Sequence, residues 1–392
     1  MNKRILVVGG GIGGLAAALA CSRAGTDAAL FERASAFSEV GAGIQLGPNV
    51  VKVLQGWGLQ DALKAVAAFP QRLQVRSAMT GQELGVLRLG AATVQRYGAP
   101  YATIHRADLH ALLLAALKQG GDMPLNLDSE VAGFVQHDTG VMLRTTDGRQ
   151  AQGAALVGAD GLWSRVRQQL LGDAAPVASG HLAYRALVAQ SSLPEKLRSH
   201  QVTVWLGPAM HAVQYPVQAG ASLNVVVIVT GRVPGDIASW DHAANSANLR
   251  RSLAHACSPL QELLQAIAHW RLWGLSIRPP MRGPWEQAQN RVALLGDAAH
   301  PMVPYLAQGA GMAIEDAQAL AQSLAASGVD VVTALRHYAN ARWQRNARVQ
   351  AGALRNGQIF HATGLLRWGR DAAMKVLGEH LLDMPWLYRG PA

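Results

Sequence analysis

Residues 4–32 read RILVVGGGIGGLAAALACSRAGTDAALFE, and this stretch decides the fold class. The aliphatic run at its start, residues 4–8, predicts a buried parallel strand. The alanine-rich segment 15–23 predicts a helix, and residues 27–31 predict a second strand. A strand, a glycine turn, a helix and a further strand within about 30 residues form the unit from which dinucleotide-binding α/β domains are built.

The glycines of the turn point to a phosphate site. Gly9, Gly11 and Gly14 have the Gly-x-Gly-x-x-Gly spacing, which permits a tight bend and close approach of the backbone to a pyrophosphate. Glu32 lies about 20 residues after Gly11, the spacing expected of an acid that binds a ribose hydroxyl, and Arg33 stands beside it. The alternative is a turn that serves packing alone. No second fingerprint of this kind occurs, which favours one tightly held dinucleotide.

The first residues also admit another interpretation. Lys3 and Arg4 precede the apolar stretch 5–20, so a secretory signal peptide with Cys21 as a lipid-attachment site is an alternative. The five glycines of the turn would break an export helix, which favours a cytoplasmic protein. The two cysteines, Cys21 and Cys257, form no Cys-x-x-Cys pair and fit a reducing compartment.

Composition narrows the class of protein. The chain of 392 residues is 50% hydrophobic and 15% charged, which excludes disordered and fibrous proteins. Its net charge of +10 favours an anionic partner: nucleic acid, a membrane surface, a phosphate-bearing cofactor or an acidic substrate. The basic residues are scattered, and beyond the N-terminal stretch no apolar run is long enough for a membrane span. We therefore expect no nucleic acid and no membrane span, and the cysteine count gives no reason to expect a metal.

The pattern changes character along the chain. Short segments between residues 184 and 229 are rich in Val and aromatic residues and predict an antiparallel sheet, and from residue 312 onward the pattern is helical. We expect an α/β fold with a Rossmann-like domain, an inserted antiparallel β domain and a C-terminal helical region. The expected boundaries are 1–70, 101–177 and 288–330 for the dinucleotide-binding domain, 71–100 and 178–287 for the substrate-binding β domain, and 331–392 for the helical region.

Five further segments, taken with the glycine turn, resemble a known family. They resemble the single-component (class A) FAD-dependent aromatic hydroxylases, whose fold is that of para-hydroxybenzoate hydroxylase. The resemblance is to the branch of salicylate hydroxylase, 3-hydroxybenzoate 6-hydroxylase and 6-hydroxynicotinate monooxygenase. The segments occur in family order and are 41–45 (GAGIQ), 105–110 (HRADLH), 158–161 (GADG), 296–301 (GDAAHP) and 307–311 (AQGAG).

The resemblance implies an enzyme and its cofactors. FAD would be bound without a covalent link, and NADH or NADPH would bind transiently to reduce it. A flavin C4a-hydroperoxide formed with O2 would transfer oxygen to a phenolic, hydroxybenzoate-like or N-heteroaromatic ring. The substrate would be a small aromatic acid, and homodimers are common in the family. The alternatives are a flavin reductase or dehydrogenase that inserts no oxygen, and a non-catalytic nucleic-acid-binding protein.

The resemblance also assigns cofactor contacts. Arg106 would reach the phosphate or ribityl part of FAD, because a guanidinium binds phosphate through two parallel hydrogen bonds. Asp160 would lie near the bound dinucleotide, and Asp297 would accept hydrogen bonds from ribityl hydroxyls. The alternatives are a surface arginine at a helix start for Arg106, a helix N-cap or turn residue for Asp160, and a helix cap for Asp297. The remaining contacts are Gly43, Gly309, Ala310 and Gly311, the last three at the start of a helix whose positive end would face the flavin pyrimidine edge.

His211 and Tyr215 are the candidate substrate residues. On a strand, residues 211, 213 and 215 share one face and Gln214 points the other way. The resemblance places similar histidine and tyrosine residues against the substrate, where a histidine with a pKa of about 6.5 can take or orient a phenol proton. The alternatives are a core histidine and a packing tyrosine. Pro301 would lie near the flavin face at which oxygen reacts.

Two arginines, Arg185 and Arg278, are candidates for binding a substrate carboxylate, and packing or surface positions are the alternatives. One position departs from the 3-hydroxybenzoate branch, because Pro304 stands where those enzymes carry a polar amide. Proline has no N–H and no polar side chain. This departure leaves open which ring is the substrate and which carbon is hydroxylated.

Overall fold

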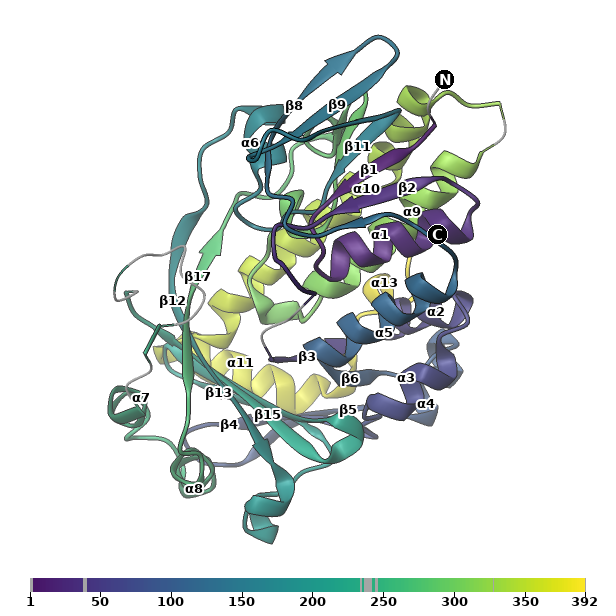
Figure 1. Cartoon of the computed structure of the whole chain (residues 1–392). Helices are drawn as coiled ribbons and strands as arrows, with labels where there is room; N and C mark the ends of the chain where they lie inside the picture. The colour runs from purple at the N-terminus through teal and green to yellow at the C-terminus, as the bar shows by residue number, and fades with distance from the viewer. Residues whose placement is uncertain are drawn as a thin grey trace.

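A six-stranded, mainly parallel sheet near the N-terminus frames one half of the molecule (Figure 1), in the order β18-β19-β11-β1-β2-β7. Every neighbouring pair is parallel except β18 with β19. The strands are β1 (Ile5–Val8), β2 (Ala28–Phe31), β7 (Leu125–Asn126), β11 (Ala155–Gly158), β18 (Ala288–Gln289) and β19 (Val292–Leu294). The structure, a computed structural model, describes residues 3–37, 41–232, 235, 242–243, 246–326 and 328–391.

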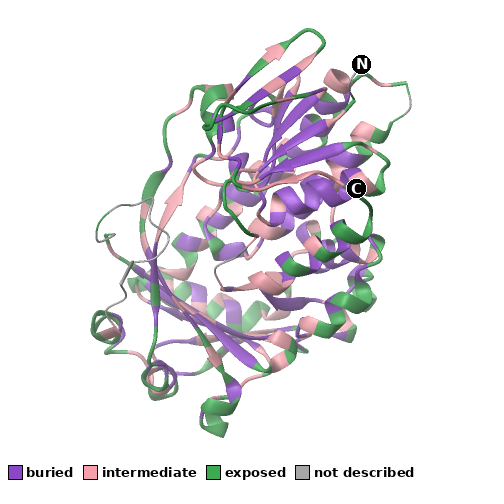
Figure 2. Ribbon diagram, in the orientation of Figure 1, coloured by how far each residue is buried: buried purple, intermediate pink, exposed green. Residues whose placement is uncertain are grey.

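The central strands of this sheet are buried along their whole length (Figure 2), because both faces of a parallel sheet are covered. Val8 pairs with Phe31 on one side and with Gly158 on the other, so β1, β2 and β11 end at the same edge. The glycine turn, Glu32 and Asp160 follow these strands and therefore meet at that edge.

Helices cover one face of the sheet, and a small antiparallel sheet covers the other. α1 packs on α5 and α9 in one apolar cluster with β1, and Phe134 and Leu143 of the small sheet pack on Leu6 and Leu156. The small sheet is β8 (Val131–His137), β9 (Gly140–Thr145) and β10 (Gln150–Gly153). The helices of this half are α1 (Ile12–Arg23), α2 (Pro48–Gly56), α3 (Gln60–Val66), α4 (Ala91–Tyr97), α5 (Arg106–Gln119), α6 (Arg165–Leu171) and α9 (Gly309–Ala325).

An eight-stranded sheet, in the order β16-β17-β12-β15-β14-β13-β4-β5, forms the second half. Its pairs are antiparallel except β13 with β4. One face packs on short helices, and the other, which carries Tyr215 and Ile228, packs on Tyr305 and on α10. The strands are β4 (Arg72–Ser77), β5 (Glu83–Arg88), β12 (Val177–Ala189), β13 (Val202–Gly207), β14 (Met210–Val217), β15 (Ser222–Thr230), β16 (His242–Ala243) and β17 (Arg271–Ile277), the short helices are α7 (Ser246–Ser252) and α8 (Ser258–Ala266), and a separate ribbon pairs β3 (Gly43–Leu46) with β6 (Ala102–His105).

Helices of the C-terminal region bridge the two halves. The 30-residue helix α10 begins after Asp330, whose carboxylate accepts a hydrogen bond from the Val332 N–H at 3.0 Å. Near its C-terminal end the chain turns into α11, which lies along β5, and the last helix brings Tyr388 against Tyr97. These helices are α10 (Val331–Phe360), α11 (Gly364–Leu377), α12 (Glu379–Leu382) and α13 (Pro385–Tyr388). The predicted α/β class, with an antiparallel sheet inserted and helices at the end, is confirmed.

Candidate active site

The glycine turn brings the backbone of α1 closer to the sheet than a side chain would allow. Gly9 has a φ of +104°, and a Cβ there would lie 2.4 Å from the Ala159 carbonyl oxygen. A Cβ on Gly14 would lie 1.8 Å from the Gly9 oxygen. Gly11 is the N-cap of α1, no side chain caps that end, and its first turn contains no acid. These are the properties of a backbone site for a pyrophosphate.

Glu32 lies against this turn. Its carboxylate accepts a hydrogen bond from the Gly10 N–H at 2.5 Å and from the Ala34 N–H at 2.8 Å, while Arg33 beside it is exposed. The predicted acid is therefore positioned at the edge of the turn, as a ribose contact requires. Its contact with a ribose stays a prediction, as does the contact of Arg33 with the cofactor.

Asp297 faces the uncapped start of α9. Its Oδ1 is 3.9 Å from the position of a Cβ on Gly309, and α9 has neither a side-chain cap nor an acid in its first turn. The Asp297 side chain is exposed, yet the protein around it desolvates the carboxyl and raises its pKa, an effect that the positive charge of Arg106 opposes. The free N–H groups of Gly309, Ala310 and Gly311 leave a positive helix end next to this carboxylate.

Arg106 is the first residue of α5, and its N–H donates to the Ala42 carbonyl at 2.8 Å. This bond ties the segment 41–45 to the helix start, where Gly43 pairs with His105 across the β3–β6 ribbon. Charge interactions connect Arg106 with both Asp297 and Arg185. The side chain thus stands between the predicted ribityl contact and the sheet that carries the substrate candidates.

Asp160 has a structural function at the start of α6, in agreement with the helix-cap alternative. Its carboxylate accepts hydrogen bonds from the Ser164 hydroxyl at 2.5 Å and from the Val166 N–H at 3.1 Å, so it helps to cap α6. Burial raises the pKa of this carboxyl. The backbone around Ala159 contacts the glycine turn at Gly9. Asp160 therefore fixes the loop beside the dinucleotide position, and a direct contact with the cofactor stays a prediction.

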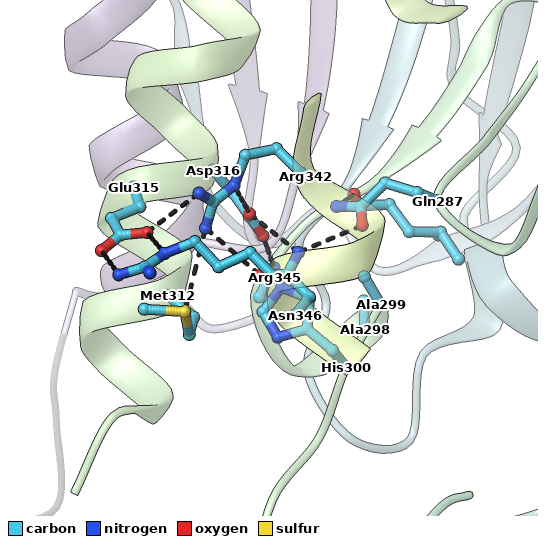
Figure 3. A network of polar contacts seen from close by, with 12 residues as sticks. Gln287, Ala298, Ala299, His300, Met312, Glu315, Asp316, Arg342, Arg345 and Asn346 are labelled. Carbon is cyan, nitrogen blue, oxygen red and sulfur yellow. Dashed lines mark hydrogen bonds and ion pairs between the residues drawn. The ribbon is translucent and has the colours of Figure 1, made fainter. Parts of the chain in front are cut away.

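A buried ionic network holds the loop 296–301 from behind (Figure 3). Asp316 on α9 contacts His300 Nε2 at 2.5 Å and Arg342 Nε at 2.7 Å, and all three side chains are almost fully buried. Arg342 also binds Glu315, which Arg345 contacts with two nitrogens. Burial opposes the charge on Asp316, but its cationic neighbours hold the pKa of the carboxyl well below its usual range.

Arg167 supports the same loop from the other side. Its guanidinium donates to the Ala298 oxygen at 3.2 Å and to the Ala299 oxygen at 2.6 Å, and it pairs with Asp173. Sequence reasoning assigned no function of their own to Arg167 and Arg342, because neither belongs to a motif and each acts through a contact distant in sequence. Both residues position the Gly296–Pro301 backbone that the motif itself supplies.

The face of β14 is as predicted from strand alternation. Val213 and Tyr215 belong to the apolar cluster on the inner face, and the His211 ring lies 5.0 Å from the Tyr305 ring on that side. Gln214 points away and accepts a hydrogen bond from Trp205 Nε1 at 3.1 Å. Burial raises the pKa of Tyr215, so its hydroxyl stays protonated and able to donate.

Tyr215 lies against the segment 41–45. A Cβ on Gly43 would lie 2.6 Å from the Tyr215 ring and equally close to Asn224, and the Gly43 N–H donates to Asn224 Oδ1 at 2.7 Å. Gln45 hydrogen-bonds Tyr215 and accepts from the Tyr101 hydroxyl at 2.7 Å. Gly43 therefore leaves room for a substrate candidate beside the cofactor segment. Sequence reasoning missed Asn224, which lies 181 positions from Gly43 and carries no motif.

His211 is 2% exposed, and its ring meets two others that the sequence did not connect with it. Nδ1 of His211 lies 2.7 Å from Nε2 of His361, and the Phe360 ring lies 5.2 Å from the His211 ring. Burial holds the pKa of His211 well below its ordinary value, and the charges of His361 and His181 lower it further. The imidazole is therefore neutral near pH 7, the form in which a histidine can accept a proton.

The two carboxylate candidates differ. Arg278 is buried and paired with Asp173 at 3.0 Å, and it also donates to the Ala174 carbonyl, so it is a structural ion-pair residue and the prediction for it is wrong. Arg185 stacks on Trp273 with its Cζ 4.7 Å from the ring centre, and its Nε is buried without a hydrogen-bond partner. Among the described residues no carboxylate pairs with Arg185, which leaves this guanidinium able to bind an anion.

The two prolines of the loop differ in exposure. Pro301 is buried, and its carbonyl accepts a hydrogen bond from Gln350 Nε2 at 3.1 Å. Pro304 is exposed and begins the short helix η6 (Pro304–Leu306), after which Ala307 has a φ of +53°. The loop is therefore anchored at Pro301 and turns sharply just before α9.

Within the described ranges, acidic, cysteine and histidine side chains form no group that could hold a metal ion. Among the described helices, none combines the length and the apolar character that a membrane span needs.

Comparisons with known proteins decide the family. A family model described as FAD binding domain matches residues 2–353. The chain belongs to this family. The 3-hydroxybenzoate 6-hydroxylase of Polaromonas naphthalenivorans is 37% identical over 387 residues, which are 98% of this chain and 95% of that relative. The 6-hydroxynicotinate 3-monooxygenase of Bordetella bronchiseptica is 36% identical over 355 residues, 89% of this chain and 90% of the relative.

A solved structure agrees with these relatives. The crystal structure of Klebsiella pneumoniae HpxO complexed with FAD and uric acid has a TM-score of 0.85 at 26% identity and covers 97% of this chain and 94% of that one. The resemblance inferred from the motifs is confirmed, and with it the cofactor and the class of reaction. The chain is an FAD-dependent aromatic-ring monooxygenase, for which NAD(P)H is the reductant.

The residues present fit FAD. The glycine turn and the uncapped starts of α1 and α9 provide backbone N–H groups for its phosphates and its pyrimidine edge. Glu32 and Asp297 offer carboxylate oxygens for ribose and ribityl hydroxyls, and Arg106 stands beside Asp297. We therefore assign these residues as the FAD contacts, and the assignment residue by residue stays a proposal.

Proposed function

We propose that this enzyme hydroxylates a phenolic ring that carries a carboxylate, and that His211 takes the phenol proton. The observation that carries the proposal is the shared face of β14, where neutral His211 and protonated Tyr215 look toward the loop that the GDAAHP motif begins. The two relatives are named for 3-hydroxybenzoate and 6-hydroxynicotinate, which are hydroxylated aromatic acids.

His211 is suited to accept the proton by its position and its charge. Nε2 of His211 has no hydrogen-bond partner within the described part of the chain, since its only polar contact is made through Nδ1. A neutral ring nitrogen without a partner can accept a proton from a hydroxyl on the substrate. Removal of that proton makes the ring electron-rich. Tyr215, which stays protonated, would donate a hydrogen bond to the same oxygen and orient it.

FAD supplies the redox chemistry when bound, accepting a hydride from NAD(P)H and activating O2. The protein contributes position and charge. Pro301 and the loop behind it are fixed by the Asp316 network and by Arg167, so the substrate face meets a rigid surface. The positive end of α9 would stabilise negative charge on the reduced flavin.

Arg185 is the residue that we propose to bind the substrate carboxylate. Its guanidinium lies over the Trp273 ring. It is also close enough to Tyr215 and Arg106 for their charges to affect it. Burial lowers the pKa of Arg185, and Arg106 lowers it further, so an anion bound here would relieve the cost of two neighbouring positive charges. A carboxylate accepts the planar guanidinium in a bidentate geometry.

The test uses one pair of compounds, 3-hydroxybenzoate and 3-hydroxybenzamide, with FAD-loaded enzyme. Arg185→Met should raise KM for the acid about 10-fold or more, because hydrogen bonds between charged groups are stronger than neutral ones. KM for the amide should change much less. The matched control is Arg144→Met, on an exposed position of β9. Equal effects of Arg185→Met on both compounds would refute the carboxylate contact.

A further inference from the structure

The neighbourhood of His211 contains two more histidines, and they come from distant parts of the chain. His211 lies on β14, His181 on β12, and His361 at the C-terminal end of α10. The His361 ring centre lies 5.0 Å from that of His211 and 4.7 Å from that of His181. Tyr305 completes the group, with its hydroxyl 2.7 Å from His181 Nδ1. We call these four side chains the histidine cluster.

A direct nitrogen–nitrogen contact joins the buried ring of His211 to the half-buried ring of His361. Nδ1 of His211 and Nε2 of His361 are 2.7 Å apart, which requires one shared proton. His211 is buried, whereas His361 is half-buried and precedes the exposed residue Thr363. His361 Nδ1 is buried and has no hydrogen-bond partner. The pair therefore runs from the inner sheet face to the end of α10, two residues before the exposed residue Thr363.

The charges around the pair favour neutral rings. The titratable and charged groups that face His361 are His211 from β14, His181 from β12, Tyr305 from η6 and Arg370 from α11. None of these is an acid. Burial, with the charges of His181 and Arg370, lowers the pKa of His361 to about 4. Two neutral imidazoles in contact have one donor and one acceptor nitrogen each, so a proton can cross both rings without a lasting imidazolium.

We propose that His361 relays the substrate proton from His211 to solvent. The phenol O–H bond breaks and its proton goes to His211 Nε2, while the proton on His211 Nδ1 passes to His361 Nε2 and the proton on His361 Nδ1 passes to a water molecule that enters at the end of α10 and accepts it at this buried, unpartnered nitrogen. Each ring loses one N–H and gains another, no electrons are transferred, and the products are a bound phenolate and one released proton. In this relay His361 receives the substrate proton only through His211, so it is a positioning residue.

This relay rests on the proposed function, because it needs a phenolic substrate at His211. It also goes beyond it, since an isolated buried base would keep the proton and become an imidazolium that its surroundings disfavour. The contact with His361 lets a proton leave His211 through Nδ1 while the substrate proton binds to Nε2. Return of a proton along the same path would reset both rings after each turnover.

The experiment measures proton release without turnover. FAD-loaded enzyme without NAD(P)H is mixed with 3-hydroxybenzoate in weak buffer that contains a pH indicator, and phenolate formation is followed by ultraviolet absorbance. His361→Gln keeps a hydrogen-bonding group but cannot pass a proton between two ring nitrogens. Proton release should become about 10-fold slower or more, the lower range of general acid–base effects, with Kd changed less than about threefold. His337→Gln, at an exposed position of the same helix, should match the parent enzyme.

A second variant separates relay from structure. His361→Ala leaves space for free imidazole, which should restore proton release and the pH profile of hydroxylation toward those of the parent. Unchanged release in His361→Gln, or no restoration by imidazole in a folded, FAD-loaded His361→Ala, would overturn the relay. If the parent enzyme itself forms no phenolate with 3-hydroxybenzoate or 6-hydroxynicotinate, the proposed function fails rather than the relay alone.

Discussion

Two polar clusters, the network around Asp316 and the histidine cluster, are built in opposite ways. The network around Asp316 consists of carboxylates, guanidiniums and the His300 ring in direct contact (Figure 3), and Glu315, Asp316 and Arg342 in it are nearly fully buried. The histidine cluster contains no carboxylate, and the pKa of each of its three imidazoles is lowered. The first cluster keeps its charges in place. The second stays uncharged and is therefore able to exchange protons.

The difference follows from what each cluster must do. The loop 296–301 has to keep its backbone fixed, and an ion-pair network with several bonds per side chain resists movement. A base that accepts a phenol proton must instead avoid a permanent charge, because a fixed imidazolium could accept nothing. Burial has a different effect in each cluster. It strengthens the attraction between paired charges in the first and disfavours an unpaired charge on a ring in the second.

The largest expected effect is on the charged network. Arg342→Met removes the cation between Glu315 and Asp316 and leaves these buried carboxylates with only Arg345 and His300 as ion-pair partners within the network. The free energy of unfolding should fall by about 3–5 kcal/mol, as expected when one partner of a buried pair is lost. Urea unfolding of the FAD-loaded enzyme measures this. Arg336→Met, at an exposed position of the same helix, should change stability by less than about 0.5 kcal/mol. A small effect of Arg342→Met would show that the network is not the scaffold we describe.

The histidine cluster should respond in activity rather than in stability. His211→Gln should lower kcat with 3-hydroxybenzoate by about 100-fold or more, because the base that takes the phenol proton is lost. FAD content should remain that of the parent enzyme. Gln214→Leu, on the opposite face of the same strand, removes the bond from Trp205 and should cost about 1 kcal/mol of stability while kcat is retained. A kcat for His211→Gln close to that of the parent would remove this residue from the mechanism.

The two clusters should also separate in their pH dependence of stability. The pKa values of His181, His211 and His361 are lower in the folded protein than their ordinary value of 6.5, so the unfolded chain binds more protons just below that pH. Stability should therefore fall as the pH is lowered from 6.5 toward 5.

The carboxylates of Glu315 and Asp316 have depressed pKa values and contribute stability above their ordinary values of 4.5 and 3.8, which is lost only at lower pH. The raised pKa values of Asp160 and Asp297 act in the opposite direction, so the histidine contribution is the difference between parent and variant in melting temperatures from pH 6.5 to 5. His361→Gln should flatten this dependence, and His337→Gln should leave it unchanged. An identical slope in His361→Gln would mean that His361 titrates normally in the folded protein.

Sequence reasoning succeeded where chemistry is local. The strand, glycine turn and helix at the N-terminus follow from spacing within about 30 residues, and strand alternation alone placed His211 and Tyr215 on one face with Gln214 on the other. It failed where a contact joins distant segments. Arg278 is paired with Asp173, 105 positions away, and that partner could not be read from the sequence around either residue.

The same limit explains the residues that the sequence did not reveal. His361 lies 150 positions from His211, at the end of a helix with no motif, and Arg342 contacts Asp316 across 26 positions. Periodicity gives the face of a helix or strand, but the partner of that face depends on how the elements pack. The glycine motifs show where the cofactor binds, whereas the groups that stabilise the loop and serve the substrate come together only in the folded chain.

Incorporation of oxygen from labelled dioxygen tests the central claim most directly. FAD-loaded enzyme is supplied with NADH, ¹⁸O₂ and a panel that includes 3-hydroxybenzoate and 6-hydroxynicotinate, and each product is identified by mass. We predict that at least one phenolic acid stimulates NADH oxidation and gains one ¹⁸O atom on its ring. Stimulated NADH oxidation that yields hydrogen peroxide alone, with no labelled product from any phenolic acid, would contradict the proposed function and favour a reductase that inserts no oxygen.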